Sequence, residues 1–198
     1  MLKMTSELIN TLRKDVELDD AEAAYVLSYF KKQIYKRGAV LLQAGDPATE
    51  VFFVLKGTLH QFYLDESGAE KSCNFAFEND FITDLESFSK QTGATSCIKS
   101  LTETSVLCLT CKDMAVLLRE LPAIAVFFRV LMERIAAESM ERTKSLLAYS
   151  PQKRFIDLAE TRPDIFQRVP QRYIAQYLGI APESLSRIRK RLFTEAKS

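Results

Sequence analysis

The spacing of hydrophobic and polar positions changes several times along the chain. Near the N-terminus, Leu8, Ile9 and Leu12 share one helical face, and Asp19 and Asp20 precede an apolar stretch as helix-starting residues do. From residue 34 onward, short apolar runs alternate with turn signals rich in glycine. These runs, which indicate β-strands, are 39–42, 51–55, 59–64, 73–77 and 105–109. Short strands at this spacing predict an antiparallel barrel or jelly roll.

A long apolar helix is predicted after the β-rich region. Residues 112–120 indicate one helix, Pro122 suits the first turn of the next, and residues 123–147 contain neither Gly nor Pro. Such a helix is ~37 Å long at 1.5 Å per residue. One interpretation is a dimerisation helix at about 122–148 that packs against its own copy; the other is a helix lying over the barrel of one chain. The residues expected in the dimer contact are Ile124, Phe128, Leu131 and Ile135.

Proline and charge both separate the C-terminal end from the rest of the chain. Ser150 and Pro151 interrupt the helical pattern, so we expect one domain at 1–148 and a second at 149–198. Residues 151–198 have ten basic and five acidic side chains, a net charge of +5, which leaves −4 for residues 1–150 in a chain of net charge +1. A basic end on an acidic body predicts a polyanion-binding module, with a solvated basic helix as the alternative.

The stretch 169–192 has the pattern of helix, tight turn and helix. Gly179 is placed to end the first helix in a left-handed conformation, and Pro182 is placed in the first turn of the second. Ala175 is small enough to let the two helices cross closely. One apolar side joins both helices through Ile174, Leu178, Ile180, Leu185, Ile188 and Leu192. This pattern, with the local positive charge, favours a DNA-reading helix-turn-helix over an ordinary helical hairpin.

The polar side of this motif supplies candidate DNA-binding residues. Arginine forms paired hydrogen bonds with guanine, and glutamate accepts from the cytosine amino group. Serine and lysine suit phosphate oxygens, which position a helix without specifying sequence. The candidates are Gln171, Arg172, Glu183, Ser184, Ser186, Arg187, Lys190 and Arg191.

Residues 183–188, Glu-Ser-Leu-Ser-Arg-Ile, resemble the recognition helix of the Crp/Fnr family of bacterial transcription regulators, and the likeness covers nearly the whole chain. The resemblance implies an α+β fold with an N-terminal jelly-roll barrel, a long dimerisation helix and a C-terminal winged-helix-like domain. It implies a homodimer that binds an inverted repeat in double-stranded DNA, contacts RNA polymerase and is not an enzyme. Glu183 and Arg187 are then the base-reading residues. Few residues follow this helix, so we expect the C-terminal wing to be reduced or absent.

The same resemblance locates an effector pocket. Cyclic-nucleotide-binding members have a Gly-Glu pair that meets the ribose and an Arg followed by Ser or Thr that binds the phosphate. Here Thr83-Asp84, followed by Leu85, and Ala94-Thr95 stand at those places, and Ser139 falls near the base-contacting position. Ala94 lacks the guanidinium that would neutralise a phosphate. We therefore expect a degenerate pocket with an unknown effector or none; a genuinely cyclic-nucleotide-dependent regulator is the alternative.

The remaining chemistry-bearing residues indicate no catalytic, metal or cofactor site. Cys108 and Cys111 form a lone CxxC pair, interpreted as small apolar fillers with redox pairing as the alternative, and no cofactor is expected. The only histidine, His60, is interpreted as an outward strand residue rather than a haem ligand. A cupin-type jelly-roll enzyme is disfavoured because its site needs clustered histidines with a carboxylate, and this chain has one histidine. No apolar run reaches ~18 residues, and no signal sequence is readable, so we expect a cytoplasmic protein without membrane contact.

Overall fold

The computed structural model describes residues 2–195. Lys197, one of the ten basic residues near the C-terminus, and the place expected for a wing lie outside the described residues. The helices are α1 (Leu2–Leu12), α2 (Asp20–Tyr29), α3 (Leu85–Lys90), α4 (Cys111–Glu120), α5 (Pro122–Ala148), α6 (Pro151–Thr161), α7 (Ile165–Arg168), α8 (Gln171–Tyr177) and α9 (Pro182–Glu195). The strands are β1 (Lys31–Tyr35), β2 (Val40–Leu42), β3 (Glu50–Lys56), β4 (Leu59–Leu64), β5 (Glu70–Ala76), β6 (Phe81–Ile82), β7 (Cys97–Ser100) and β8 (Thr104–Thr110).

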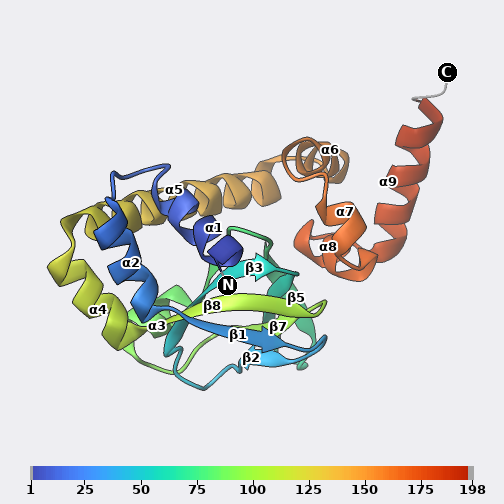
Figure 1. The fold of residues 1–198 in the computed structure, drawn as a ribbon. Helices are drawn as coiled ribbons and strands as arrows, with labels where there is room; N and C mark the ends of the chain where they lie inside the picture. Colours follow the sequence, from blue (N-terminus) through green and yellow to red (C-terminus); the bar gives the residue numbers. More distant parts are fainter. Residues whose placement is uncertain (1, 196–198) are drawn as a thin grey trace.

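The strands form two antiparallel sheets, which confirms the predicted jelly-roll class. One sheet has the order β1-β8-β3-β6 and the other β2-β7-β4-β5 (Figure 1). All five predicted strands are present, whereas β1, β6 and β7 were not predicted. Strand β1 is a sheet edge whose exposed residues include Lys31 and Lys32, so its alternation of apolar side chains is weak.

Strand β3 explains how the barrel is tied to the helices. Residues 51–55 are all buried because apolar groups cover both faces of this strand. Phe52 and Val54 point into the barrel interior, where they pack with Ile98 and Val106. The alternate side chains, Phe53 among them, face the helices. That second core includes buried residues of α1, α2, α4 and the start of α5.

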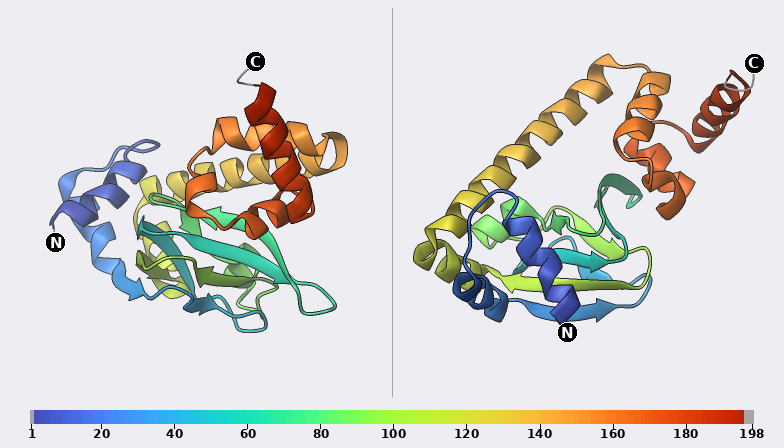
Figure 2. Two further views of the ribbon diagram at one scale, coloured as in Figure 1. Left: turned by 90° about the vertical axis from the view of Figure 1, so that its right-hand side faces the viewer. Right: turned by 45° about the horizontal axis from the view of Figure 1, so that its top comes forward.

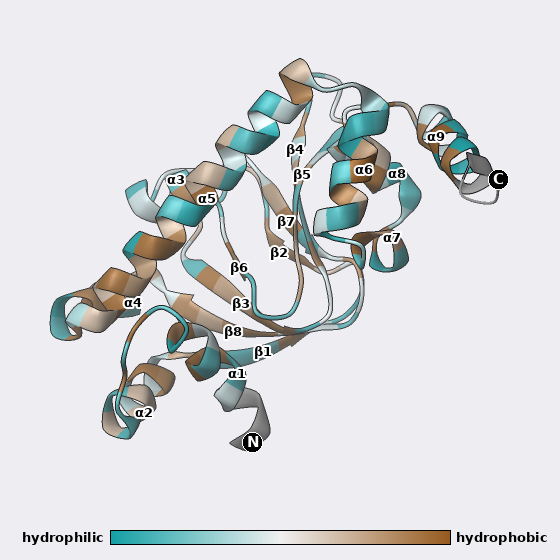
Figure 3. Cartoon of the chain, turned by 90° about the horizontal axis from the view of Figure 1, so that it is seen from above, coloured by the Kyte–Doolittle hydropathy of each residue, from teal (hydrophilic) through white to brown (hydrophobic). Residues whose placement is uncertain are grey.

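Helix α5 extends from this core to the C-terminal helices, as Figure 2 shows. Its apolar residues are concentrated in the half next to α4 (Figure 3). Ile124 is 1% exposed within the core of its own chain, so the prediction that it contributes to a dimer surface is wrong. Phe128 and Leu131 are also partly buried against this core, and Ile135 is half-buried. The apolar pattern at the start of α5 therefore serves packing within one chain.

The C-terminal helices share an apolar core with the barrel. Phe155, Ile165 and Ile174 belong to a cluster that also contains Phe75 and Phe77 from strand β5 and the loop after it. Ser150 caps α6 by accepting from the backbone N–H of Lys153 at 3.2 Å, so one helix ends and another begins where this was predicted. The division into domains at 148/149 stays a prediction, because this shared core crosses it.

Candidate nucleic-acid interface and effector pocket

Helices α8 and α9 form the predicted helix-turn-helix. Gly179 has φ +65°. Its N–H donates to Gln176 O, and the Ile180 N–H donates to Ala175 O, both at 3.0 Å; this pairing ends α8 in a Schellman motif. An added Cβ at Gly179 would approach Leu146 Cδ2 to 3.2 Å, so the turn also lies close to helix α5. Ala175 is fully buried at the crossing, as its size predicts.

The second helix presents a polar face to solvent. Leu185 and Ile188 are buried, whereas Glu183, Ser186, Arg187, Lys190 and Arg191 are exposed. Ser184 is half-buried, and its hydroxyl accepts from Arg187 Nη2 at 3.2 Å. Arg191 donates to Gln152 of α6. Glu183 and Arg187 lie one turn apart on α9, so their side chains leave the same face.

The two candidates on α8 lie at its N-terminus, apart from this face. Gln171 and Arg172 are both exposed. The Arg172 guanidinium lies 4.6 Å from the Tyr173 ring centroid and donates to the Tyr173 hydroxyl at 2.9 Å. Their DNA-contacting role stays a prediction.

The effector-pocket candidates come together at the start of α3, except for Ser139. Thr83, Asp84 and Ala94 are buried, whereas Leu85 and Thr95 are exposed. Ala94 pairs with the β2–β3 loop: its N–H donates to Asp46 O and its carbonyl accepts from the Gly45 N–H, each at 2.8 Å. Asp84 caps α3 and also accepts hydrogen bonds from Thr95.

Ser139 lies apart from this group, exposed on α5. Its carbonyl accepts from the Thr143 hydroxyl one turn later, at 2.9 Å. The structure therefore does not bring Ser139 to the α3 loop through any hydrogen bond among the described residues.

Comparison with known proteins identifies relatives that resemble both the barrel and the helix-turn-helix region. The family described as "Cyclic nucleotide-binding domain" matches residues 32–120. The chain is 24% identical over 183 residues to the cAMP-activated global transcriptional regulator CRP of Shigella flexneri, covering 87% of each chain. It is 21% identical over 196 residues to the regulator of the same name from Haemophilus influenzae, covering 94% of this chain and 88% of that one. The chain thus contains a region that matches the cyclic nucleotide-binding domain, and it is similar over most of its length to CRP regulators.

Solved structures with this fold resemble the chain over most of its length. FixK2 from Bradyrhizobium japonicum superposes with a TM-score of 0.72 at 16% identity, covering 84% of this chain and 86% of that one. The c-di-GMP responsive global regulator CLP of Xanthomonas campestris gives a TM-score of 0.71 at 15% identity, covering 90% and 93%. These likenesses confirm the mixed fold.

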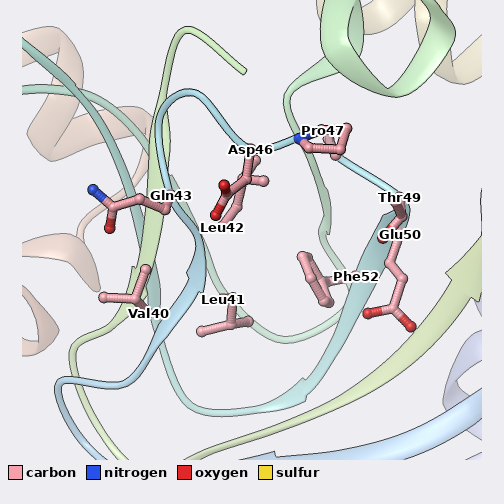
Figure 4. Close-up of a pocket in the computed structure, with 10 residues that line it drawn as sticks. Val40, Leu41, Leu42, Gln43, Asp46, Pro47, Thr49, Glu50 and Phe52 are labelled. Carbon is pink, nitrogen blue, oxygen red and sulfur yellow. The ribbon is translucent and has the colours of Figure 1, made fainter. Parts of the chain in front are cut away.

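A hollow of about 240 Å³ lies beside the loop of the effector-pocket candidates, between β2 and β3 (Figure 4). Leu41, Leu42 and Phe52 form its apolar part, and the carboxylates of Asp46 and Glu50 belong to its lining. No basic side chain lines it within the described residues. This hollow is therefore unsuited to a phosphate group.

The structure places His60 differently from the sequence-based interpretation. His60 is 0% exposed, so the prediction of an outward position is wrong. Helix α8 covers this face of β4, and the ring of Tyr173 lies 4.4 Å from the His60 ring, centroid to centroid. Phe62 and Phe75 stack on the same imidazole at 5.1 and 5.0 Å. We call this contact, made by His60, Ser72 and Phe75 with Tyr173 and Gln176, the barrel–α8 interface.

A short hydrogen-bond chain crosses the barrel–α8 interface. Ser72 Oγ donates to Gln176 Oε1 at 2.8 Å and therefore accepts from His60 Nε2, also at 2.8 Å. His60 Nδ1 is then a buried acceptor with no partner in the described residues. Burial lowers the pKa of His60 to about 3, and the positive charge of Lys99 acts in the same direction.

Sequence reasoning also missed an arginine clamp on the barrel. Arg168 of α7 forms hydrogen bonds to both carboxylate oxygens of Glu78, at 2.5 and 2.9 Å, and donates to Gly57 O at 2.6 Å. Burial acts to raise the pKa of Glu78, but the hydrogen bonds from Arg168 and the Gly57 N–H outweigh it and hold the pKa below its usual range. Arg162 likewise donates to Phe75 O at 3.2 Å. Two of the arginines that make the C-terminal end basic thus bind the barrel.

The cysteines are unpaired thiols, and Cys108 is buried in β8 as expected of an apolar filler. Burial raises the pKa of the Cys108 thiol to about 12. In the described part of the chain, no group of three or more His, Cys, Asp or Glu side chains is arranged to hold a metal ion. Among residues 2–195, no helix has the length and apolarity needed to cross a membrane.

Proposed function

We propose that this chain is a homodimeric, sequence-specific DNA-binding transcription regulator with a degenerate cyclic-nucleotide site. The observation that supports it best is the exposed face of α9, where Glu183 and Arg187 stand one turn apart on a helix held by a buried apolar side. A helix with a polar, cation-bearing face of this kind fits the major groove and reads base edges there. The cAMP-activated and c-di-GMP responsive relatives are global regulators, which agrees with this assignment.

The proposal is tested by selecting binding sites from random double-stranded DNA with the full-length protein. We expect an inverted repeat whose half-site centres lie about one helical turn apart, near 34–36 Å, because two-fold symmetry in the protein is mirrored in its operator. Recovery of sequences without any shared preference contradicts sequence-specific binding. A single, non-repeated half-site contradicts the dimer but not the recognition helix.

We propose that α5 from Met132 onward forms the dimer contact, in place of the buried Ile124. The exposed side chains there follow a helical stripe with spacings of three and four residues. They are Met132, Ala136, Met140, Thr143 and Leu147. Met140 is 75% exposed and Leu147 83%, which is unusual for large apolar side chains on one helix and is explained by a second copy covering them.

Met140→Asp is expected to raise the dimer dissociation constant by about 100-fold or more, since two charges would be buried in an apolar contact. Sedimentation equilibrium measures this directly. Glu138→Gln, on the opposite side of α5 and also exposed, serves as the matched control and should leave the dimer intact. An unchanged association of Met140→Asp would place the dimer contact elsewhere.

A further inference from the structure

The Asp84 carboxylate is held by an unusually complete set of hydrogen-bond donors. Asp84 is 5% exposed, and its Oδ1 accepts from the Ser87 N–H at 3.1 Å, which caps α3. Its Oδ2 accepts from two successive backbone N–H groups, Thr95 at 3.1 Å and Ser96 at 3.0 Å. The Ser96 and Thr95 hydroxyls donate to the same oxygen at 2.7 and 3.3 Å. One oxygen thus receives four donors from one short segment.

A further hydrogen bond, from Gln61 of β4, fixes the orientation of the Ser96 hydroxyl. Ser96 is fully buried, and its hydroxyl accepts from Gln61 Nε2 at 2.8 Å, so its own proton points to Asp84. Gln61 Nε2 also lies 3.3 Å from Thr83 O, on the other side of Asp84. Strand β4 therefore supports both ends of the loop that encloses the carboxylate.

Hydrogen bonds, and no ion pair among the described residues, stabilise the Asp84 carboxylate. None of the ion pairs in the described residues includes Asp84. Successive backbone N–H groups combined with hydroxyls form an anion-binding concavity, the kind of donor set that also receives phosphate oxygens. A free anion entering here would have to displace a carboxylate that is already tethered, so its binding would be opposed by both charge and occupancy.

We propose that Asp84 is a built-in anionic ligand: its carboxylate fills the donor set that a diffusible anion would otherwise occupy and ties α3 to the start of β7. This deepens the degenerate effector site of the proposed function, on which its regulatory meaning rests. The loop is held closed by the chain itself, so its shape does not depend on an added nucleotide. The chemical class that fits the emptied cradle is a small carboxylate.

The test is thermal unfolding of the full-length protein in sodium formate against sodium chloride at equal ionic strength. Asp84→Ala removes the carboxylate and leaves room for formate. We expect it to lower Tm by roughly 5–10 °C in chloride, because several buried donors lose their acceptor. Formate should then restore a saturable part of that loss, as mass action requires of a ligand that binds only the folded state.

Asp84→Asn is the matched control, since it keeps the volume of the side chain and leaves no room for formate. We expect its Tm, and that of the wild type, to be equal in the two salts. If formate stabilises Asp84→Ala no more than Asp84→Asn, the proposal is overturned. If Asp84→Ala is unfolded in chloride, circular dichroism follows the same titration. Folding on formate addition supports the proposal, and failure to fold in saturating formate overturns it.

A second arm uses cyclic AMP with the wild-type protein and calorimetry. We expect no heat of binding, because the phosphate would have to displace Asp84 and Ala94 offers it no cation. Micromolar affinity would overturn the proposal. Both arms omit DNA, so a failed operator selection would count against the proposed function without changing either readout.

Discussion

Arg187→Ala is expected to weaken binding to the selected operator by about 30-fold to 10⁴-fold. A paired arginine–guanine contact contributes about 1–3 kcal/mol, and a dimer loses it in both half-sites. Arg187 is exposed on α9 one turn beyond Glu183, and its guanidinium donates to the neighbouring Ser184, so we expect the substitution to leave the domain folded. Fluorescence anisotropy with operator and scrambled duplexes measures the change in affinity. Repeated site selection should show relaxed preference at one position per half-site.

Lys190→Ala provides the comparison for this experiment. Lys190 is exposed on the same helix, and a lysine that binds phosphate contributes equally to all sequences. We expect weaker binding to operator and scrambled DNA alike, with the salt slope reduced by about one for each phosphate that the substitution leaves without its cation. If Arg187→Ala instead selects the same sequences with the same preferences as the wild type, base reading lies elsewhere on the protein.

The wild-type protein is expected to lose about 2–3 kcal/mol of unfolding free energy between pH 7 and pH 4.5 through His60 alone. The His60 pKa is about 3 in the folded protein against 6.5 for the free side chain. A lowered pKa means that the unfolded chain binds the proton more readily, so stability is full above about pH 6.5 and falls as the pH falls toward 3. The structural cause is Nδ1, where the incoming proton would find aromatic rings and no acceptor.

Urea unfolding of His60→Phe at both pH values isolates this contribution. Phenylalanine keeps the stacking with Phe75 and Tyr173 but cannot be protonated, so the variant should have a smaller loss toward acid. The charged groups facing the ring are Lys99, Glu70 and Arg172. Burial opposes ionisation of Glu70, but its contact with Lys99 holds its pKa below the usual range. Equal pH dependence in both proteins would show that His60 is not the responsible group.

The local sequence pattern predicted correctly those features in which the contacting residues are close together in the sequence. Asp19 accepts from the Glu22 N–H and so begins α2 where the two aspartates indicated a helix. Gly179 ends α8 with the positive φ that its place in the turn requires. The apolar side of the helix-turn-helix was predicted for the same reason, since every residue of that pattern lies within two adjacent helices.

Pattern failed where the deciding neighbour lies far along the chain. Alternation in β4 assigns His60 to the side opposite its neighbour Leu59, yet both are buried, because Tyr173 arrives from a helix more than a hundred residues later. Arg168 is one of the basic residues that made the C-terminal end look like a DNA-binding module. Only the fold shows that its guanidinium forms an ion pair with Glu78 of the barrel domain. Asp84 was aligned with a ribose contact, and nothing in the sequence shows that the backbone at Thr95 and Ser96 would turn toward it.

The apolar core shared by the barrel and the C-terminal helices also sets an order of events during synthesis. Phe75 and Phe77 leave the ribosome well before Phe155, Ile165 and Ile174, which complete the same core. Domains generally fold from the N-terminus as they are made. Phe75 and Phe77 therefore stay exposed on the nascent barrel until the C-terminal helices have been synthesised. These helices then fold onto a barrel surface that has already formed. Ribosomal stalling or truncation late in the chain thus leaves an aggregation-prone hydrophobic surface exposed on a folded barrel.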